Sequence, residues 1–213
     1  MTMLPYCSLT SMSPRRENYI VVALGGVTNG GKTSVCKEIE KHLDAVSFHM
    51  DHYFWDEDSP NHIRLPGFNG HANWDTVEAV DFDKLYHDVK TWIEKHSKQS
   101  EHSSSSADAS PVVRQTPVLL VEGILVLNHK PLMELFDQKF YFTLTEEECI
   151  KRRNLRNYEP PDPEGYFDGV VWPMHLKFKR EIENRNDVVF ISGAQDKNKT
   201  IELILKQITS NLQ

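Results

Sequence analysis

Short apolar runs alternate along the chain with segments whose apolar residues recur at helical spacing. The runs are rich in β-branched residues, which predicts strands at residues 19–24, 45–50, 118–121, 140–144 and 188–191. Apolar residues three and four positions apart predict helices at residues 32–43, 81–94, 145–156, 171–183 and 200–212. Alternating strands and helices favour an α/β fold with three layers, in which helices cover both faces of a mainly parallel five-stranded sheet.

Two segments lack this periodicity. Residues 1–18 contain prolines, serines and arginines without the apolar centre of a secretory signal, and we expect a disordered leader. Residues 97–116 include seven serines, and we expect a disordered loop inserted into a single domain that spans residues 19–213. A passive insertion and a phosphorylated regulatory loop are both compatible with this composition.

The most specific motif is the glycine-rich turn between the first strand and the first helix. Residues 26–33 match the pattern G-x-x-x-x-G-K-[ST], and we call them the phosphate loop. Backbone N–H groups in such a loop close around phosphate oxygens, and the helix N-terminus adds positive potential. Lys32 is expected to reach the β- and γ-phosphates, and the Thr33 hydroxyl to bind Mg²⁺. The motif predicts a nucleoside triphosphate site formed by Gly26, Val27, Thr28, Asn29, Gly30, Gly31, Lys32, Thr33 and Ser34.

Composition narrows the possible partners. The chain of 213 residues has a net charge of −7, so it lacks the basic surface typical of nucleic-acid binding. Its apolar runs are too short to span a membrane. Cys7, Cys36 and Cys149 show neither zinc spacing nor a disulfide framework, which indicates a reducing compartment. We therefore expect a cytoplasmic monomer that acts on a small molecule.

Two carboxylates follow predicted strands. Ligands of parallel sheets bind beyond the carboxyl ends of the strands, where Asp51 and Glu122 stand. Asp51 is predicted to orient an acceptor hydroxyl and to accept its proton, rather than only to cap a turn. Glu122 is predicted to hold Mg²⁺, directly or through water, and the alternative is a hydrogen-bonding carboxylate at a strand end.

A basic cluster at residues 151–158 stands out in an acidic chain. It lies late in a predicted helix and precedes the prolines at 160 and 161, which should end that helix. We predict that residues 151–169 form a small lid and the segment that follows it, and that the lid brings arginines onto the transferred phosphate. The alternative is a solvated helix face.

Three further groups have a plain structural interpretation. Asp75 precedes a predicted helix and can be its N-cap, and the aromatic residues at 166–174 can belong to the core. His49 and His52 flank Asp51 and are interpreted as local hydrogen-bonding groups.

The whole set of motifs resembles the P-loop nucleoside and metabolite kinases, which include uridine and gluconate kinases. Within this group, it is most similar to the nicotinamide riboside kinases. The resemblance covers about residues 19–210. It is carried by the phosphate loop, Trp74-Asp75, Glu122-Gly123, residues 149–158, Pro160-Pro161-Asp162, Gly165-Tyr-Phe-Asp-Gly169 and Val171-Trp-Pro-Met174.

The resemblance implies a P-loop NTPase-type fold and ATP-dependent phosphorylation of the ribose 5′-hydroxyl of nicotinamide riboside, with nicotinic acid riboside as a second substrate. The product would be the mononucleotide used in NAD biosynthesis. Mg²⁺ would be bound by Thr33, Asp51 and Glu122, and catalysis would rest on Asp51, Lys32 and Glu122. Besides the phosphate loop, ATP would contact Arg152, Arg156, Gln195, Asp196 and Lys197. The riboside would contact Asp51, Phe54, Trp74, Asp75, Arg153, Tyr158 and Glu159, with its pyridine ring between Trp74 and Tyr158 and its 2′- and 3′-hydroxyls on Asp75 and Arg153.

The chain departs from this pattern at two positions. Known members carry tyrosine where Trp74 stands, and they tend to have a second acid at the position of His52. These departures concern the ring preference and the metal site rather than the type of reaction.

Two other functions compete with this interpretation. A uridine/cytidine-type kinase would share almost every part of the site. A nucleotide-dependent switch protein would need an Asn-Lys-x-Asp guanine-binding motif, which the sequence lacks.

Overall fold

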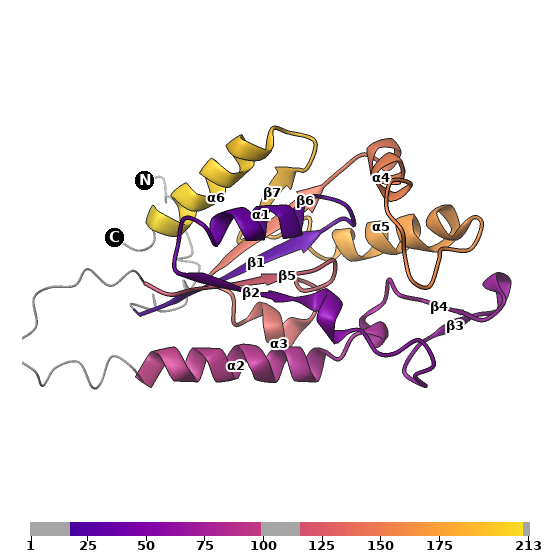
Figure 1. Cartoon of the computed structure of the whole chain (residues 1–213), viewed down its shortest axis with the longest axis horizontal. Helices are drawn as coiled ribbons and strands as arrows, with labels where there is room; N and C mark the ends of the chain where they lie inside the picture. The colour runs from indigo at the N-terminus through magenta and orange to yellow at the C-terminus, as the bar shows by residue number, and fades with distance from the viewer. Residues whose placement is uncertain (1–17, 99–115, 211–213) are drawn as a thin grey trace, which may run out of the picture.

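The computed structural model describes residues 18–98 and 116–210 (Figure 1). Nearly all of the expected leader and of the expected serine-rich loop lies outside these residues. The expected start of the loop at residue 97 is wrong, because helix α2 (Phe82–Lys98) continues through Ser97 and Lys98. The Ser97 hydroxyl donates to the carbonyl of Ile93 one turn earlier, so this serine is accommodated as a helical residue.

Five parallel strands form the central sheet, as the alternating pattern predicts. Their order is β2-β5-β1-β6-β7, which puts the phosphate-loop strand in the centre. Their bounds are Ile20–Gly26 for β1, Ala45–His49 for β2, Val118–Glu122 for β5, Gln138–Thr143 for β6 and Val189–Ser192 for β7. Leu24, His49 and Glu122 pair in register, so β1, β2 and β5 end at the same edge of the sheet.

Helices cover both faces of the sheet (Figure 1). Alternate residues of β1 belong to different core clusters, because successive side chains of a strand point to opposite faces. One cluster joins Val22 to helices α1 (Lys32–Ile39) and α6 (Lys197–Ser210). The other joins Val21 to α2, α3 (Lys130–Met133) and α5 (Trp172–Arg180). The predicted three-layer architecture is confirmed.

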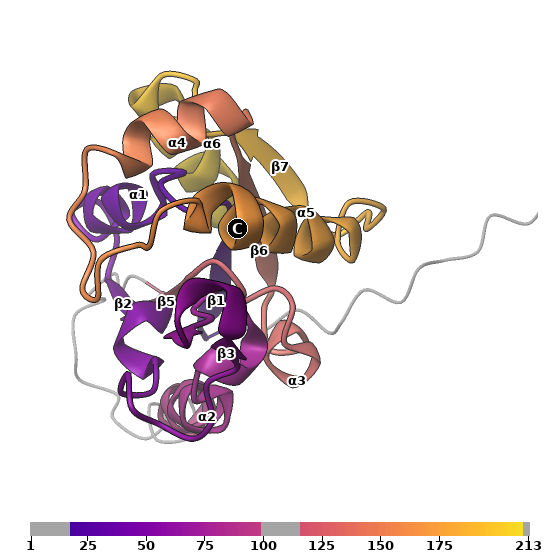
Figure 2. The same ribbon diagram turned by 90° about the vertical axis from the view of Figure 1, so that its right-hand side faces the viewer.

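A smaller substructure lies beyond the carboxyl ends of the strands (Figure 2). It contains helix α4 (Glu146–Arg153), the π-helical turn Phe167–Val171 and a short antiparallel pair, β3 (Arg64–Leu65) with β4 (His71–Ala72). A third apolar cluster holds these pieces together around the buried ring of Tyr166. The π-helical turn runs directly into α5, so the helical segment starts at Phe167, before the predicted start at residue 171. The α-helix itself ends at Arg180, before the predicted end at residue 183.

Helix α4 is shorter than predicted. Thr145 caps it, and its hydroxyl accepts the backbone N–H of Glu148 at 3.2 Å. In a full capping box the Glu148 carboxylate would accept the backbone N–H of Thr145, but here it accepts from Arg152 at 2.8 Å. The helix ends at Arg153 rather than at residue 156, and its last residues enter the loop that leads to Pro160.

No helix among the described residues is both long enough and apolar enough to cross a lipid bilayer.

Candidate active site

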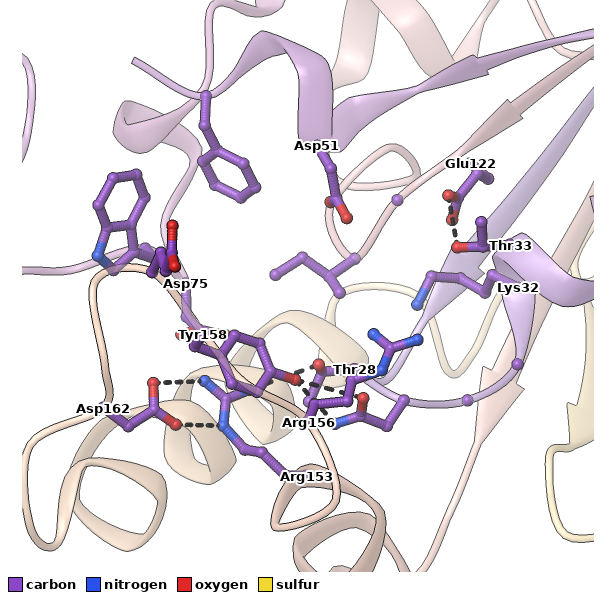
Figure 3. Close-up of a pocket in the computed structure, with 18 of the residues that line it drawn as sticks. Thr28, Lys32, Thr33, Asp51, Asp75, Glu122, Arg153, Arg156, Tyr158 and Asp162 are labelled. Atoms are coloured by element: carbon purple, nitrogen blue, oxygen red, sulfur yellow. Dashed lines mark hydrogen bonds and ion pairs between the residues drawn. The ribbon is translucent and has the colours of Figure 1, made fainter. Parts of the chain in front are cut away.

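A pocket of about 350 Å³ opens at the carboxyl ends of β1, β2 and β5 (Figure 3). This is the edge at which the sequence predicts ligand binding. Most of the predicted site residues line the pocket: Thr28, Asn29, Gly30, Gly31, Lys32, Thr33, Ser34, Asp51, Phe54, Trp74, Asp75, Glu122, Arg153, Arg156, Tyr158 and Glu159. Gly26, Val27, Arg152, Gln195, Asp196 and Lys197 do not line it.

The phosphate loop runs from the end of β1 to the start of α1. Gly26 has a φ of 111°, and an added Cβ would lie 2.2 Å from the carbonyl oxygen of Phe142 on β6, so only glycine fits there. The Lys32 ammonium is buried and donates to the carbonyls of Gly26 at 3.2 Å and of Val27 at 2.8 Å. Burial lowers the pKa of Lys32, and the negative charges of nearby carboxylates oppose this shift. The loop therefore curls around a lysine whose charge faces little solvent.

Glu122 and Thr33 meet across the pocket floor. The Thr33 hydroxyl donates to Glu122 Oε1 at 2.8 Å, and His49 Nδ1 lies 2.8 Å from the same oxygen. Glu122 is thus a buried, hydrogen-bonding carboxylate at a strand end. The interpretation of His49 as a local hydrogen-bonding group is confirmed, and the ring of His52 lies 5.4 Å from that of His49.

Asp51 stands on a 3₁₀ turn (Met50–Tyr53) that follows β2 directly. Solvent in the pocket reaches its side chain, but the walls around the carboxyl displace bulk water and raise its pKa. The negative charge of Glu122 raises the pKa of Asp51 further, whereas the charge of Lys32 lowers it. Asp51 is therefore a somewhat stronger base than a free aspartate.

The turn that carries Asp51 lies close to the end of β5, the strand that carries Glu122. Gly123 follows Glu122, and a Cβ built on it would lie 2.3 Å from Cβ of Met50. Met50 is fully buried beside Asp51 in the chain. The turn that carries Asp51 can lie this close to the end of β5 because residue 123 has no side chain.

The donor set fits a magnesium ion. A hydroxyl and two carboxylates, from Thr33, Asp51 and Glu122, line the same pocket, and Mg²⁺ prefers oxygen ligands. Within the described ranges, no group of three or more His, Cys, Asp and Glu side chains is placed to enclose a metal. Mg²⁺ usually keeps several waters and binds substrate phosphates together with one or two protein carboxylates.

Arg153 is held rigidly at the end of α4. Its guanidinium pairs with both carboxylate oxygens of Asp162, at 2.6 and 3.0 Å, and it stacks 4.2 Å from the ring centre of Tyr158. It also donates to the Thr28 hydroxyl at 3.5 Å. Figure 3 shows Arg153 between Asp162 and the phosphate loop, on the far side of Tyr158 from Asp51. The pairing partner Asp162 lines the pocket, but its sequence context gave it no individual role.

The other lid residues also contact the phosphate loop. Tyr158 and Asn29 exchange hydrogen bonds through the tyrosine hydroxyl and the side-chain amide, at 3.2 and 3.3 Å. Arg152 donates to the carbonyl of Asn29 at 3.2 Å from outside the pocket, while Arg156 lines the pocket and is exposed. The lid segment and the phosphate loop are therefore directly linked.

The side chains of Trp74 and Phe54 form an aromatic part of the pocket lining. The Trp74 ring lies 5.6 Å from that of Phe54 and 4.4 Å from that of His62, in edge-on arrangements. His62 is buried behind Trp74 and was missed by sequence reasoning, because a single histidine in a polar loop carries no pattern. Trp74 and Tyr158 both line the pocket, from different segments of the chain.

Asp75 is buried next to Trp74. Burial raises its pKa to about 6, and the negative charge of Asp162 contributes, whereas the positive charge of Arg153 lowers it. Its backbone N–H is hydrogen-bonded to the side chain of Asn73, at 3.1 Å. Asp75 does not open a regular helix as an N-cap, since α2 begins only at Phe82.

Residues 195–197 are exposed and have structural contacts of their own. The Gln195 amide donates to Thr200 at 2.8 Å, and the Asp196 carboxylate accepts the N–H of Lys199 at the start of α6. Gly193, two residues before Gln195, lies so close to the phosphate loop that an added Cβ would be 2.7 Å from the carbonyl oxygen of Gly30. The loop therefore adjoins the phosphate loop outside the pocket.

Comparison with known proteins identifies relatives along nearly the whole chain. Residues 21–160 match the phosphoribulokinase / uridine kinase family. Nicotinamide riboside kinase 1 of Mus musculus is 35% identical over 194 residues, which are 91% of this chain and 95% of that protein. Nicotinamide riboside kinase 2 of Homo sapiens is 33% identical over 195 residues, which are 91% of this chain and 82% of that protein. A uridine kinase of Clostridium tetani is 26% identical over 214 residues, which cover 91% of this chain and 96% of that protein.

The fold is also found in solved structures. An unliganded sugar kinase of Janibacter sp. superposes with a TM-score of 0.54 at 13% identity, covering 90% of this chain and 95% of that one. A putative fructose transport system kinase of Silicibacter sp. gives a TM-score of 0.51 at 15% identity, covering 84% and 93%. At this level of identity the likeness concerns the fold alone.

Proposed function

Because the chain belongs to the nicotinamide riboside kinases, within the phosphoribulokinase / uridine kinase family, we propose that it transfers the γ-phosphate of ATP to the ribose 5′-hydroxyl of nicotinamide riboside. The product is nicotinamide mononucleotide, a precursor of NAD, and nicotinic acid riboside is a second substrate. The observation that carries the proposal is that one pocket is lined both by the phosphate loop and by the aromatic side chains of Trp74 and Tyr158.

ATP binds with its triphosphate in the phosphate loop. Backbone N–H groups and the start of α1 contact the phosphate oxygens, and Lys32 leaves its carbonyl partners to reach the β- and γ-phosphates. Arg156 faces the pocket and stabilises charge on the transferred group, while Arg152 contacts ATP from the rim. Gln195, Asp196 and Lys197 contact the adenine, which their position beside the phosphate loop supports.

Asp51 orients the acceptor. It binds the 5′-hydroxyl, aims it at the γ-phosphate and accepts its proton as the bond forms. Phosphoryl transfer passes through a loose transition state, so a fixed hydroxyl matters more than early deprotonation. The raised pKa of Asp51 assists the proton transfer.

Mg²⁺ completes the site. Thr33, Asp51 and Glu122 hold it directly or through water, and the ion withdraws charge from the phosphate oxygens of ATP when bound.

The riboside end of the pocket suits a cationic ring. Nicotinamide riboside carries a positive pyridinium, and an aromatic face attracts a cation by about 0.5–2 kcal/mol, depending on desolvation. Trp74 and Tyr158 sandwich this ring, with Phe54 and Glu159 beside it. The ribose 2′- and 3′-hydroxyls bind Asp75 and Arg153.

The proposal includes a monomeric enzyme in the cytoplasm. Cys36 and Cys149, the cysteines in the described part of the chain, are buried free thiols, which supports a reducing compartment.

Release of ADP with a panel of ribosides tests the function. The purified chain, with ATP and Mg²⁺, receives nicotinamide riboside, nicotinic acid riboside, uridine or cytidine, and mass spectrometry identifies the product. We expect the highest kcat/KM with nicotinamide riboside and a gain of one phosphate. Lys32→Ala serves as the inactive control, because it removes the charge that contacts the transferred phosphate.

A uridine kinase is the second candidate, which the Clostridium tetani relative favours. A higher kcat/KM for uridine than for nicotinamide riboside would establish that function instead. No ADP release with any riboside would overturn both.

A further inference from the structure

Tyr166 joins two of the residues that are proposed to bind the riboside, Trp74 and Asp75. Its ring is almost fully buried, with 1% of its surface exposed. Its hydroxyl accepts the backbone N–H of Trp74 at 3.1 Å and lies 3.4 Å from Oδ2 of Asp75, to which it donates. The carbonyl of Ala72, at 3.5 Å, shares this donation. Tyr166 itself does not line the pocket.

We propose that Tyr166 is a positioning residue for the riboside, and that its hydroxyl holds the Trp74 backbone and the Asp75 carboxylate in the geometry that binds the ring and the sugar. This inference rests on the proposed function. It assigns a role to a residue that the sequence alone marks only as a candidate for the core.

The contacts of the hydroxyl distinguish this role from simple packing. The ring of Tyr166 packs edge-on against Phe68 at 5.7 Å and against His71 at 4.9 Å, and a phenylalanine would fill this space equally well. The hydroxyl adds hydrogen bonds to a segment 91 and 92 residues away in the sequence. A buried hydroxyl with partners on adjacent residues fixes both of them relative to the lid segment.

The hydrogen bond from Tyr166 to Asp75 also affects the ionisation of Asp75. Burial disfavours the ionised form of Asp75, whereas Arg153 on α4 and the Tyr166 hydroxyl favour it, and Asp162 in the lid loop disfavours it. The donated hydrogen bond therefore helps to keep Asp75 ionised, which is the form that accepts hydrogen bonds from ribose hydroxyls.

Tyr166→Phe is the direct test, because it removes one hydroxyl and keeps the ring. We expect the KM for nicotinamide riboside to rise about tenfold, since a hydrogen bond to a charged group is lost. The KM for ATP should stay within about twofold and kcat should change little. Thermal unfolding checks that the variant is folded at the assay temperature.

Two control variants separate the hydroxyl from packing. Tyr19→Phe removes another largely buried tyrosine hydroxyl, one that is hydrogen-bonded to Ser97, and should leave both KM values unchanged. Phe68→Leu weakens the packing of the Tyr166 ring but keeps its hydroxyl, so a purely structural role predicts that it mimics Tyr166→Phe. The proposal predicts a much smaller effect of Phe68→Leu on the KM for the riboside.

The pH profile provides an independent readout. Loss of the donated hydrogen bond raises the pKa of Asp75, so the acidic limb of log kcat/KM for the riboside should move to higher pH in Tyr166→Phe. Protonation of ATP itself affects both enzymes equally. The measured quantity is therefore the difference in pH between the acidic limbs of wild type and Tyr166→Phe. An unchanged limb together with an unchanged KM for the riboside overturns the proposal, as does an equal rise in both KM values.

Failure of this inference is distinguishable from failure of the proposed function. Wild-type activity on nicotinamide riboside with an unaltered Tyr166→Phe variant rejects the positioning role alone. Absence of wild-type activity on this substrate rejects the function.

Discussion

Asp51 combines three properties at the scale of one residue. It follows the end of β2, it lies open to the pocket, and the walls around it raise its pKa without burying it completely. A carboxylate in this setting can accept a hydrogen bond from an alcohol and then its proton. The proposed function directs its contribution at the acceptor rather than at the nucleotide.

Asp51→Asn should therefore lower kcat by about 10²–10⁴-fold, the range typical of a lost general base, and leave the KM for ATP within a few-fold. Steady-state kinetics with both substrates measure the two effects. Asp56→Asn, on an exposed residue outside the pocket, is the matched control. Near-normal turnover of Asp51→Asn would exclude Asp51 as the base.

Trp74 lines the pocket next to Phe54, where we propose that the pyridinium ring binds. Trp74→Ala removes one aromatic face and should raise the KM for nicotinamide riboside by about 3–30-fold, in line with about 0.5–2 kcal/mol of cation–π attraction. The KM for ATP should be nearly unchanged, and a neutral nucleoside such as uridine should lose less. Kinetics with all three substrates measure this, and equal losses for the charged and the neutral riboside would contradict it.

Site residues that belong to a short sequence motif could be predicted from the sequence. The residues that contact them from distant parts of the chain could not. The phosphate loop is recognisable because its chemistry requires a short spacing of glycine, lysine and threonine. Asp162 and Tyr166 act through contacts with Arg153 and Asp75, and those contacts depend on how distant segments fold together. Glu148 illustrates the reverse case, because its position three residues after Thr145 favours a reciprocal capping box, but Arg152 competes for its carboxylate.

Helix α4 carries the link between the lid and the phosphate loop at the scale of an element. It presents Arg153 to Asp162 and Arg152 to the backbone of Asn29. The helix has only eight residues, so its N-terminal cap makes up a large share of its local stability.

Thr145→Ala should lower the free energy of unfolding by about 1 kcal/mol, because it removes the side-chain cap of α4. For a chain of this size, the melting temperature should fall by about 2–4 °C, measured by calorimetry. Thr209→Ala is the control, because Thr209 is exposed near the end of α6, and it should leave the melting temperature almost unchanged. An unaltered melting temperature of Thr145→Ala would mean that the cap contributes nothing measurable.

The regular elements were predictable to within a few residues, because burial of one face imposes a period on the sequence. The short β3–β4 pair, the four-residue helix α3 and the π-helical turn were not, since they contain too few residues to show a period. The helix expected at 171–183 begins at Val171, the last residue of the π-helical turn, and otherwise corresponds to α5, which ends at Arg180.

The order of the strands is a property of the whole molecule. All five strands read as similar apolar runs, so their pattern predicts a parallel sheet but not the sequence β2-β5-β1-β6-β7. That order decides which strand ends adjoin the phosphate loop. It brings Asp51 and Glu122 to one pocket although they are far apart in the chain.

The stability of the whole molecule should reflect the buried charge of Asp75. Its pKa is about 6 in the folded chain and 3.8 without the fold, so the folded state binds more protons between these values. Stability therefore decreases as pH rises from about 4 to about 6, and ionised Asp75 costs about 2–3 kcal/mol above that range.

Asp75→Asn should consequently raise the melting temperature at pH 7.5, and the difference from wild type should vanish near pH 4. The same substitution should weaken riboside binding, because the ionised acceptor is lost. Calorimetry across pH, together with the KM for nicotinamide riboside, measures both effects. A lower melting temperature of Asp75→Asn at pH 7.5 would show that the ionised carboxylate stabilises the fold instead.

The contact between Gly123 and Met50 has a consequence for how acceptor size can change. A side chain at residue 123 would meet Cβ of Met50 at 2.3 Å, so the turn that carries Asp51 would have to move away from the end of β5. Gly123→Ala would therefore widen the pocket between the two carboxylates, while every residue proposed to contact phosphate or sugar keeps its side chain.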